Sequence, residues 1–164
     1  MTLTLSLIVE LLLLITVANG APVLVTRLLD ERWSWPVDGG IRLRDGRPLF
    51  GASKTVRGVI SGIVATTLVA AAFGYPWQLG MLFGAAAMVG DLFSSFVKRR
   101  LGIQSSGQAM GLDQIPESLF PLLACYGYLG LDPVSVVLLV LLFTLGTLIA
   151  SPVMYWLGIR KHPY

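Results

Sequence analysis

Cysteine and histidine are almost absent from this sequence, which has 164 residues and only one of each, Cys125 and His162. A single cysteine cannot form an intramolecular disulfide, and no zinc or redox framework can be built from these two residues. Charged residues are also scarce at 13%, whereas hydrophobic residues make up 55%. This composition excludes a soluble domain and predicts an integral membrane protein, in which Cys125 is a packing residue.

Apolar segments of membrane-spanning length recur along the whole chain. We therefore predict one all-α transmembrane domain over residues 1–164, with no separate soluble domain. About five transmembrane helices are expected, at residues 3–18, 56–73, 79–97, 116–131 and 134–157. Two long polar loops, residues 19–55 and 98–115, separate the first span from the second and the third span from the fourth.

The basic residues predict the orientation in the membrane. All twelve Lys and Arg residues lie in or beside the two long loops or in the C-terminal tail. By the positive-inside rule both loops are then cytoplasmic, with the N-terminus outside and the C-terminus inside. The net charge of +3 is spread over these flanks and leaves no surface for nucleic acid. We expect a multi-pass protein of the cell membrane with its active site on the cytoplasmic side.

The most informative residue is Asp91, a carboxylate inside the third apolar segment. A charge at the bilayer centre costs about 2.5–3.5 kcal/mol on insertion scales, so it indicates a functional site. Asp91, Ser94, Ser95 and Lys98 are spaced 0, 3, 4 and 7 residues along the chain, which places them on one face of a helix. Asp91 then lies roughly 10 Å from Lys98 along the axis. The alternative is a lone aspartate hydrogen-bonded to neighbouring helices.

Two further carboxylates lie at the start of the fourth predicted span, Asp113 and Glu117. Oxygen ligands of this kind suit Mg²⁺, which is usually held by one or two carboxylates together with substrate phosphates. Lys98 and Arg99 add positive charge where phosphates would lie. This combination indicates phosphoryl or nucleotidyl transfer at the cytoplasmic membrane surface.

Two other features allow a functional and a structural interpretation. The segment 45–58, DGRPLFGASKTVRG, places Lys54 and Arg57 at the start of the second span, where helix N–H groups can meet an anion. The same two cations also suit a simple positive-inside flank, and the spacing of a P-loop is absent. Glu10, in the first span, is either a site residue or a structural hydrogen-bonding group.

The stretch from Gly90 resembles the signature of the CTP-dependent phosphatidate cytidylyltransferases. It contains Gly90-Asp91-Leu92, Ser94 and Ser95, Lys98-Arg99, a glycine-containing loop and an aspartate at the next helix. The bacterial pattern continues with K-D, P-G-H-G-G and D-R-x-D, all of which this chain replaces. Its replacements, its short length and the segment 45–58 are more similar to the archaeal members of that group, the CDP-archaeol synthases.

This resemblance implies transfer of the cytidylyl group of CTP to 2,3-bis-O-geranylgeranylglycerol 1-phosphate, an isoprenoid ether-lipid phosphate, with release of pyrophosphate. It implies Mg²⁺ as cofactor, held by Asp91 and Asp113, which together with Lys98 would be the catalytic residues. Phosphate or other substrate contacts are expected at the remaining polar positions of the two loops and helix ends: Lys98, Arg99, Ser94, Ser95, Lys54, Arg57, Asn19, Asp38 and Glu117.

Two other classes were considered. The CDP-alcohol phosphotransferases are also membrane enzymes that use Mg²⁺, but their D-x-x-D-G-x-x-A-R motif is absent from this chain. A small transporter that uses Asp91 as a proton or ion relay is the alternative outside enzymes. The absence of inverted repeats or of matched broken helices in two halves argues against it.

The topology leads to a labelling prediction. Single cysteines at Gly39 and Gln104, introduced into a Cys125→Ala background, should resist an impermeant thiol reagent added to intact cells, because both loops are expected inside. A cysteine at Gln78 lies in an outside turn and should react. Labelling at Gly39 with protection at Gln78 would show that the protein has the opposite orientation.

Overall fold

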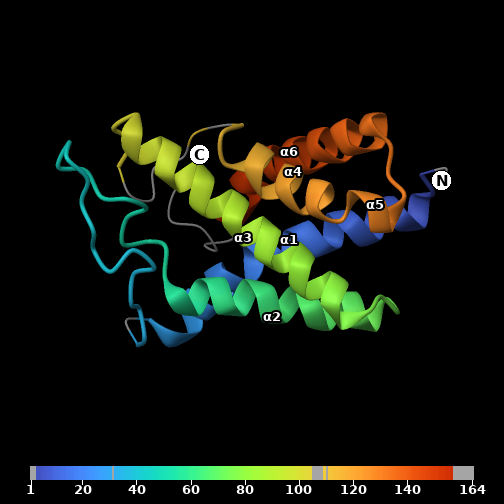
Figure 1. Ribbon diagram of the computed structural model, residues 1–164, viewed down its shortest axis with the longest axis horizontal. Coiled ribbons are helices and arrows are strands. Elements are labelled where there is room, and N and C mark those ends of the chain that lie inside the picture. The colour runs from blue at the N-terminus through green and yellow to red at the C-terminus, as the bar shows by residue number, and fades with distance from the viewer. Residues whose placement is uncertain (1–2, 31, 105–108, 110, 157–164) are drawn as a thin grey trace.

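The computed structural model describes residues 3–30, 32–104, 109 and 111–156, and the regular elements in this part of the chain are all helices. Their order is α1 (Leu5–Leu29), α2 (Val56–Ala72), α3 (Trp77–Arg100), α4 (Gln114–Ala124), α5 (Tyr126–Leu129) and α6 (Pro133–Trp156). Figure 1 shows the long helices packed side by side, with the loop before α2 reaching beyond their ends. The predicted all-α architecture is confirmed for these residues.

In the described part of the chain, three helices are long and apolar enough to cross a bilayer: α1, α3, and α6 over Pro133–Ala150. Helix α2 is apolar but has 17 residues. The predicted fourth span is divided, because α4 ends at Ala124 after 11 residues and α5 adds only four more. At about 1.5 Å per residue, α4 covers roughly 16 Å, about half the thickness of a hydrocarbon core.

The prediction that a polar loop begins at residue 19 is wrong. Helix α1 continues through Pro22 to Leu29. Proline removes one N–H, so the bond to the carbonyl of Ala18 is lost, but the apolar residues that follow keep the segment helical. A Cβ added to Gly62 of α2 would lie 2.9 Å from that carbonyl oxygen. Helix α2 therefore packs against α1 at the point where this hydrogen bond is lost.

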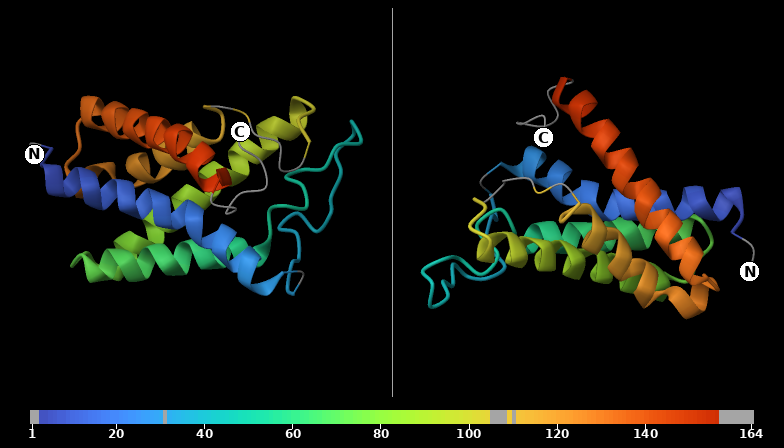
Figure 2. Two further views of the ribbon diagram at one scale, coloured as in Figure 1. Left: turned by 180° about the vertical axis from the view of Figure 1, so that it is seen from behind. Right: turned by 90° about the horizontal axis from the view of Figure 1, so that it is seen from above.

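Small residues let the helices approach one another closely. A Cβ added to Gly84 of α3 would lie 3.0 Å from the Cα of Ile63, and one added to Gly80 would lie 2.8 Å from the Cα of Thr67. Helices α2 and α3 thus pack backbone against backbone, as is typical of membrane helix pairs. The apolar core lies mainly among α1, α3, α4 and α6, and its fully buried members include Leu11, Leu14, Ile15, Phe83, Leu122 and Leu139. Seen from above, α6 crosses α1 obliquely (Figure 2).

Gly90 lies at a close contact between α3 and α4. A Cβ at this position would lie 2.2 Å from the carbonyl oxygen of Pro116 and 3.0 Å from the Cα of Glu117. No other residue fits without separating the two helices. Because Asp91 follows Gly90 and Glu117 follows Pro116, this contact also sets the distance between the two carboxyl groups.

We predict that Gly90→Ala destabilises the protein by about 1–3 kcal/mol, the usual cost of overpacking a tight contact. The measurement is the thermal unfolding midpoint of the detergent-solubilised protein. Gly146→Ala is the matched control, because a Cβ at that helical position meets nothing within 4 Å. Equal midpoints for the two variants would show that the α3–α4 contact is not restrictive.

Candidate functional site

Asp91 forms an ion pair with Lys54, and this contact joins helix α3 to the long loop before α2. The Lys54 Nζ to Asp91 Oδ1 distance is 2.5 Å, and about a fifth of each side chain is exposed. Lys54 is placed by the start of α2, where Thr55 is the N-cap and accepts a hydrogen bond from the Gly58 N–H. Asp91 is therefore paired with a cation from another element of the chain.

A second ion pair lies further along the same face of α3. The Lys98 Nζ to Asp113 Oδ1 distance is 2.6 Å, and the two side chains are 9% and 17% exposed. Asp113 immediately precedes α4 and also accepts a hydrogen bond from the Ala109 N–H. Helical spacing predicted that Asp91 and Lys98 share a face, and the structure shows each of them paired with a partner from another element.

Glu117 connects the two ion pairs. Its carboxyl group contacts that of Asp91 and interacts electrostatically with Lys54 and Asp113. Three carboxyl groups and two ammonium groups therefore lie around the junction of the start of α2, the second half of α3 and the start of α4. We refer to Lys54, Asp91, Lys98, Asp113 and Glu117 as the charged cluster.

The other predicted residues of α3 lie beside the cluster. Ser94 is fully buried, and its hydroxyl donates to the Asp91 carbonyl oxygen over 2.9 Å. Ser95 is also buried. Arg99 is only 4% exposed and interacts electrostatically with Asp113, while its Nε has no hydrogen-bond partner within the described chain. Arg99 is thus a buried cation next to the Lys98–Asp113 pair.

Two predicted substrate contacts, Asn19 and Arg57, have structural roles in this conformation. The Asn19 side chain donates to the Ile15 carbonyl of its own helix over 3.0 Å. The Arg57 guanidinium donates to the carbonyl oxygens of Asp30 and Arg32, which follow the end of α1. Arg57 therefore attaches the end of α1 to the first turn of α2, while Lys54, three residues earlier, reaches the charged cluster.

Asp38 organises the long loop. One carboxylate oxygen accepts from the Gly40 N–H over 3.0 Å, and the other accepts from the Phe50 and Gly51 N–H groups over 2.9 and 3.1 Å. Burial alone would raise the pKa of Asp38, but these backbone hydrogen bonds outweigh it and hold the pKa below its usual value. The loop thus folds around this carboxylate, whose oxygens already have partners.

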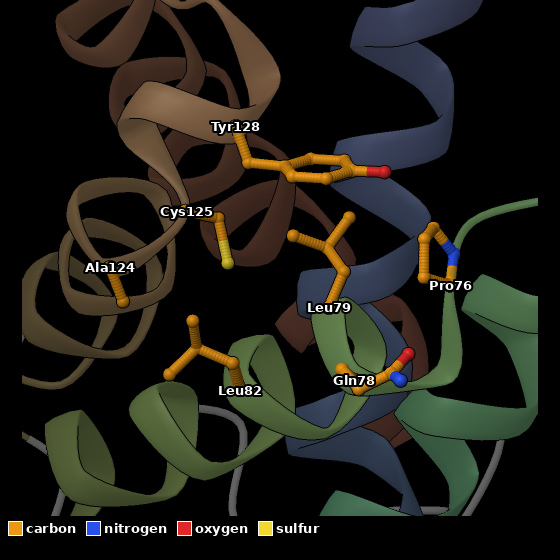
Figure 3. Close-up of a pocket in the computed structure, with 7 residues that line it drawn as sticks. All are labelled: Pro76, Gln78, Leu79, Leu82, Ala124, Cys125 and Tyr128. Atoms are coloured by element: carbon orange, nitrogen blue, oxygen red, sulfur yellow. The ribbon is translucent and has the colours of Figure 1, made fainter.

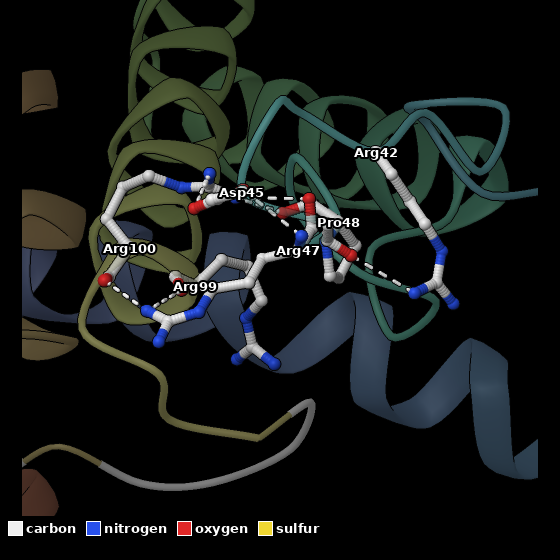
Figure 4. Close-up of polar contacts among 7 residues, drawn as sticks. Arg42, Asp45, Arg47, Pro48, Arg99 and Arg100 are labelled. Atoms are coloured by element: carbon white, nitrogen blue, oxygen red, sulfur yellow. Dashed lines mark hydrogen bonds and ion pairs between the residues drawn. The ribbon is translucent and has the colours of Figure 1, made fainter.

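Sequence reasoning did not identify the contact between the loop and the end of α3. Arg47 Nη1 donates to the Arg99 and Arg100 carbonyl oxygens over 3.3 and 2.5 Å. Arg100 in turn donates to the Asp45 carboxylate and the Pro48 carbonyl over 2.5 and 2.6 Å (Figure 4). The signal available in the sequence was the pair Asp45 and Arg47 within the quoted segment 45–58, but nothing in it predicts the partner.

Glu10 lies elsewhere, near the turn between α2 and α3. The Tyr75 hydroxyl donates to the Glu10 carboxylate over 2.6 Å, so Glu10 has the structural role that was one of its two interpretations. Burial, followed by this hydrogen bond, raises the pKa of Tyr75 to about 12. An apolar cavity of about 340 Å³ lies beside this turn, and Figure 3 shows its lining: Pro76, Gln78, Leu79, Leu82, Ala124, Cys125 and Tyr128. Cys125 is buried, as predicted for a packing residue.

These features define a class: a helical membrane protein with acidic and basic groups, suited to phosphate chemistry, gathered where three helices meet. The CarS-like (CDP-archaeol synthase) family matches residues 3–77 and 73–164. The chain belongs to this family and is therefore an enzyme, so the transporter alternative is wrong.

Individual relatives and a solved structure are also similar to this chain. The CDP-archaeol synthase of Pyrobaculum calidifontis is 38% identical over 96% of this chain and 98% of its own. That of Pyrococcus abyssi is 36% identical over 86% and 82%, and that of Hyperthermus butylicus 40% identical over 66% of each chain. A solved structure described as an intramembrane enzyme for archaeal membrane lipids biosynthesis has a TM-score of 0.72 and 32% identity, covering 90% of this chain and 94% of that one.

The role of Asp38 leads to a prediction about pH. Asp38→Asn should lower the thermal unfolding midpoint at pH 7, because an amide cannot accept hydrogen bonds on both of its polar atoms. Since the folded pKa is depressed, the ionised carboxylate stabilises the fold fully above its unfolded pKa of about 3.9. This stabilisation is lost as the pH falls through the folded value.

The measurement is the difference between the wild-type and Asp38→Asn midpoints from pH 7 to pH 3. We expect the difference to be constant at higher pH and to shrink toward pH 3. A difference that is absent at pH 7, or that grows on acidification, would contradict the assigned role of Asp38.

Proposed function

We propose that this protein transfers the cytidylyl group of CTP to 2,3-bis-O-geranylgeranylglycerol 1-phosphate, giving the CDP-activated ether lipid and pyrophosphate. The observation that carries the proposal is the charged cluster, which combines three carboxyl groups with the Lys54 and Lys98 ammonium groups at the junction of α2, α3 and α4. Family membership and the names of the relatives support it. Asp91, Asp113 and Lys98 are the proposed catalytic residues.

The cluster is suited to a substrate that carries several phosphates. In the proposed reaction, an oxygen of the lipid phosphate attacks the α-phosphorus of CTP, and the bond to the β-phosphate oxygen breaks as pyrophosphate leaves. Lys98 and Arg99 are the proposed contacts for the phosphate chain, and Lys54, from the loop before α2, is a third cation. Ammonium and guanidinium donors form short, charge-assisted hydrogen bonds to phosphate oxygens, which would replace the present contacts to carboxylates.

The carboxylate oxygens of the charged cluster are the type of ligand that Mg²⁺ prefers. No set of three His, Cys, Asp or Glu side chains in metal-binding arrangement occurs among the described residues. Mg²⁺, however, is usually held by one or two carboxylates together with substrate phosphates and waters. Asp91 and Asp113 are the proposed ligands, with Glu117 beside them. When bound, Mg²⁺ would offset the negative charge of the triphosphate.

The proposal also assigns the chain's position in the membrane. We propose five crossings, made by α1, α2, α3, the α4–α5 pair and α6, with both long loops and the charged cluster on the cytoplasmic side. The distribution of Lys and Arg supports this orientation. The placement gives the site access to cytoplasmic CTP and to a lipid phosphate at the membrane surface.

The test is pyrophosphate release by the purified protein in detergent, where no gradient exists to drive transport. Release should require CTP, the lipid phosphate and Mg²⁺ together, should stop with EDTA and should return with excess Mg²⁺. ATP should replace CTP poorly. Asp91→Asn should leave less than about a tenth of the activity, because an amide is a poor ligand for Mg²⁺.

Asp132→Asn is the matched control for that substitution. Asp132 accepts hydrogen bonds from the Ser135 N–H and hydroxyl at the start of α6, and Asn caps a helix about as well as Asp. The control should therefore keep nearly full activity. Activity of Asp91→Asn above about a tenth of wild type would remove Asp91 from the proposed metal site, and no release with any lipid phosphate would contradict the proposed function.

A further inference from the structure

Arg47 and Arg100 hold the tip of the long loop and the end of α3 together in a reciprocal manner. Arg47 donates to two carbonyl groups of α3, those of Arg99 and Arg100, over 3.3 and 2.5 Å. Arg100 donates to the Asp45 carboxylate and to the Pro48 carbonyl oxygen of the loop, and its guanidinium lies 5.4 Å from the Phe96 ring centroid. We call these contacts the arginine clamp (Figure 4).

The clamp acts on the turn of α3 that carries two proposed phosphate contacts, Lys98 and Arg99. The C-terminal carbonyl groups of a helix lack intrahelical partners and carry a partial negative charge. This end of a helix is unfavourable for a phosphate chain, in contrast to an N-terminus. Arg47 satisfies the carbonyl groups of Arg99 and Arg100 and places a positive charge on the part of the helix that would otherwise repel the nucleotide.

The chain beyond α3 is shaped to receive Arg47. Gly102 has φ +80°, and a Cβ there would lie 3.2 Å from Arg47 Nη2. The Gly102 and Ile103 N–H groups donate back to the carbonyl oxygens of Arg99 and Lys98 over 3.1 and 3.0 Å. The chain therefore turns tightly at the end of the helix, and the Arg47 guanidinium packs against this turn.

We infer that Arg47 is a positioning residue for the nucleotide. Within the described part of the chain its side-chain hydrogen bonds go to the last turn of α3. There it holds the backbone that carries Lys98 and Arg99 and neutralises the negative end of the helix. Its removal weakens the binding of the triphosphate and leaves the chemical step and the lipid phosphate site nearly unchanged. The inference rests on the proposed function, because the nucleotide is the ligand whose binding is measured.

The test compares Arg47→Met with Arg42→Met. Arg42 lies in the same loop, is exposed, and donates over 3.1 Å to the nearby Gly46 carbonyl. For Arg47→Met we expect KM for CTP to rise about fivefold, the size of a favourable helix-terminus charge effect. We expect kcat and KM for the lipid phosphate to change by less than about twofold, because the binding lost is common to ground and transition states. Arg42→Met should match the wild type.

Two further variants separate this role from a purely structural one. Arg47→Lys keeps a charged donor and should recover most of the wild-type KM for CTP. Arg47→Gln keeps a hydrogen-bond donor without the charge and should show the same raised KM for CTP as Arg47→Met. It replaces Arg47→Met in the test if that variant does not fold. A fall in kcat alone, or an unchanged KM for CTP in Arg47→Gln, would overturn the inference. Absence of pyrophosphate release by the wild type would instead overturn the proposed function.

Discussion

The Lys54–Asp91 ion pair is the interaction on which the site depends. A carboxylate in an apolar helix is costly unless it is paired, and the pairing cation here comes from a loop 37 residues away in sequence. The loop must therefore be folded and attached at a fixed position for the carboxylate to be tolerated. Asp38 and Arg57 meet this requirement, the first by organising the loop interior and the second by attaching the end of α1 to α2.

The α3–α4 contact supplies the opposite wall of the site. Gly90 allows the backbones to approach so closely that the carboxyl groups of Asp91 and Glu117 meet. Two like-charged groups at this distance repel each other unless cations or protons compensate them. Lys54 and Lys98 provide part of that compensation from two different elements. Two ammonium groups do not balance three carboxyl groups, and the proposed Mg²⁺ would add positive charge to the cluster.

Several groups that resemble ligand contacts are occupied by the fold itself. The two oxygens of Asp38 accept three backbone N–H groups, the guanidinium of Arg57 donates to two carbonyl groups, and the Asn19 amide donates within α1. These residues shape the site from outside. Arg47 belongs with them, because it reaches the end of α3 and not the charged cluster. The polar residues therefore divide into those that meet in the cluster and those that hold its walls in place.

The sequence by itself determined the membrane class and the all-helical architecture, because hydropathy and charge distribution are local properties. It also placed Lys98 on the face of Asp91. It did not predict the continuation of α1 past Pro22 or the division of α4 from α5, because proline weakens a helix without dictating whether neighbours compensate for it. Only the tertiary structure decided that Lys54 pairs with Asp91, Lys98 with Asp113 and Arg47 with the end of α3. These partners are far apart in the chain, and the packing of backbones at glycines such as Gly90 sets the distances between them.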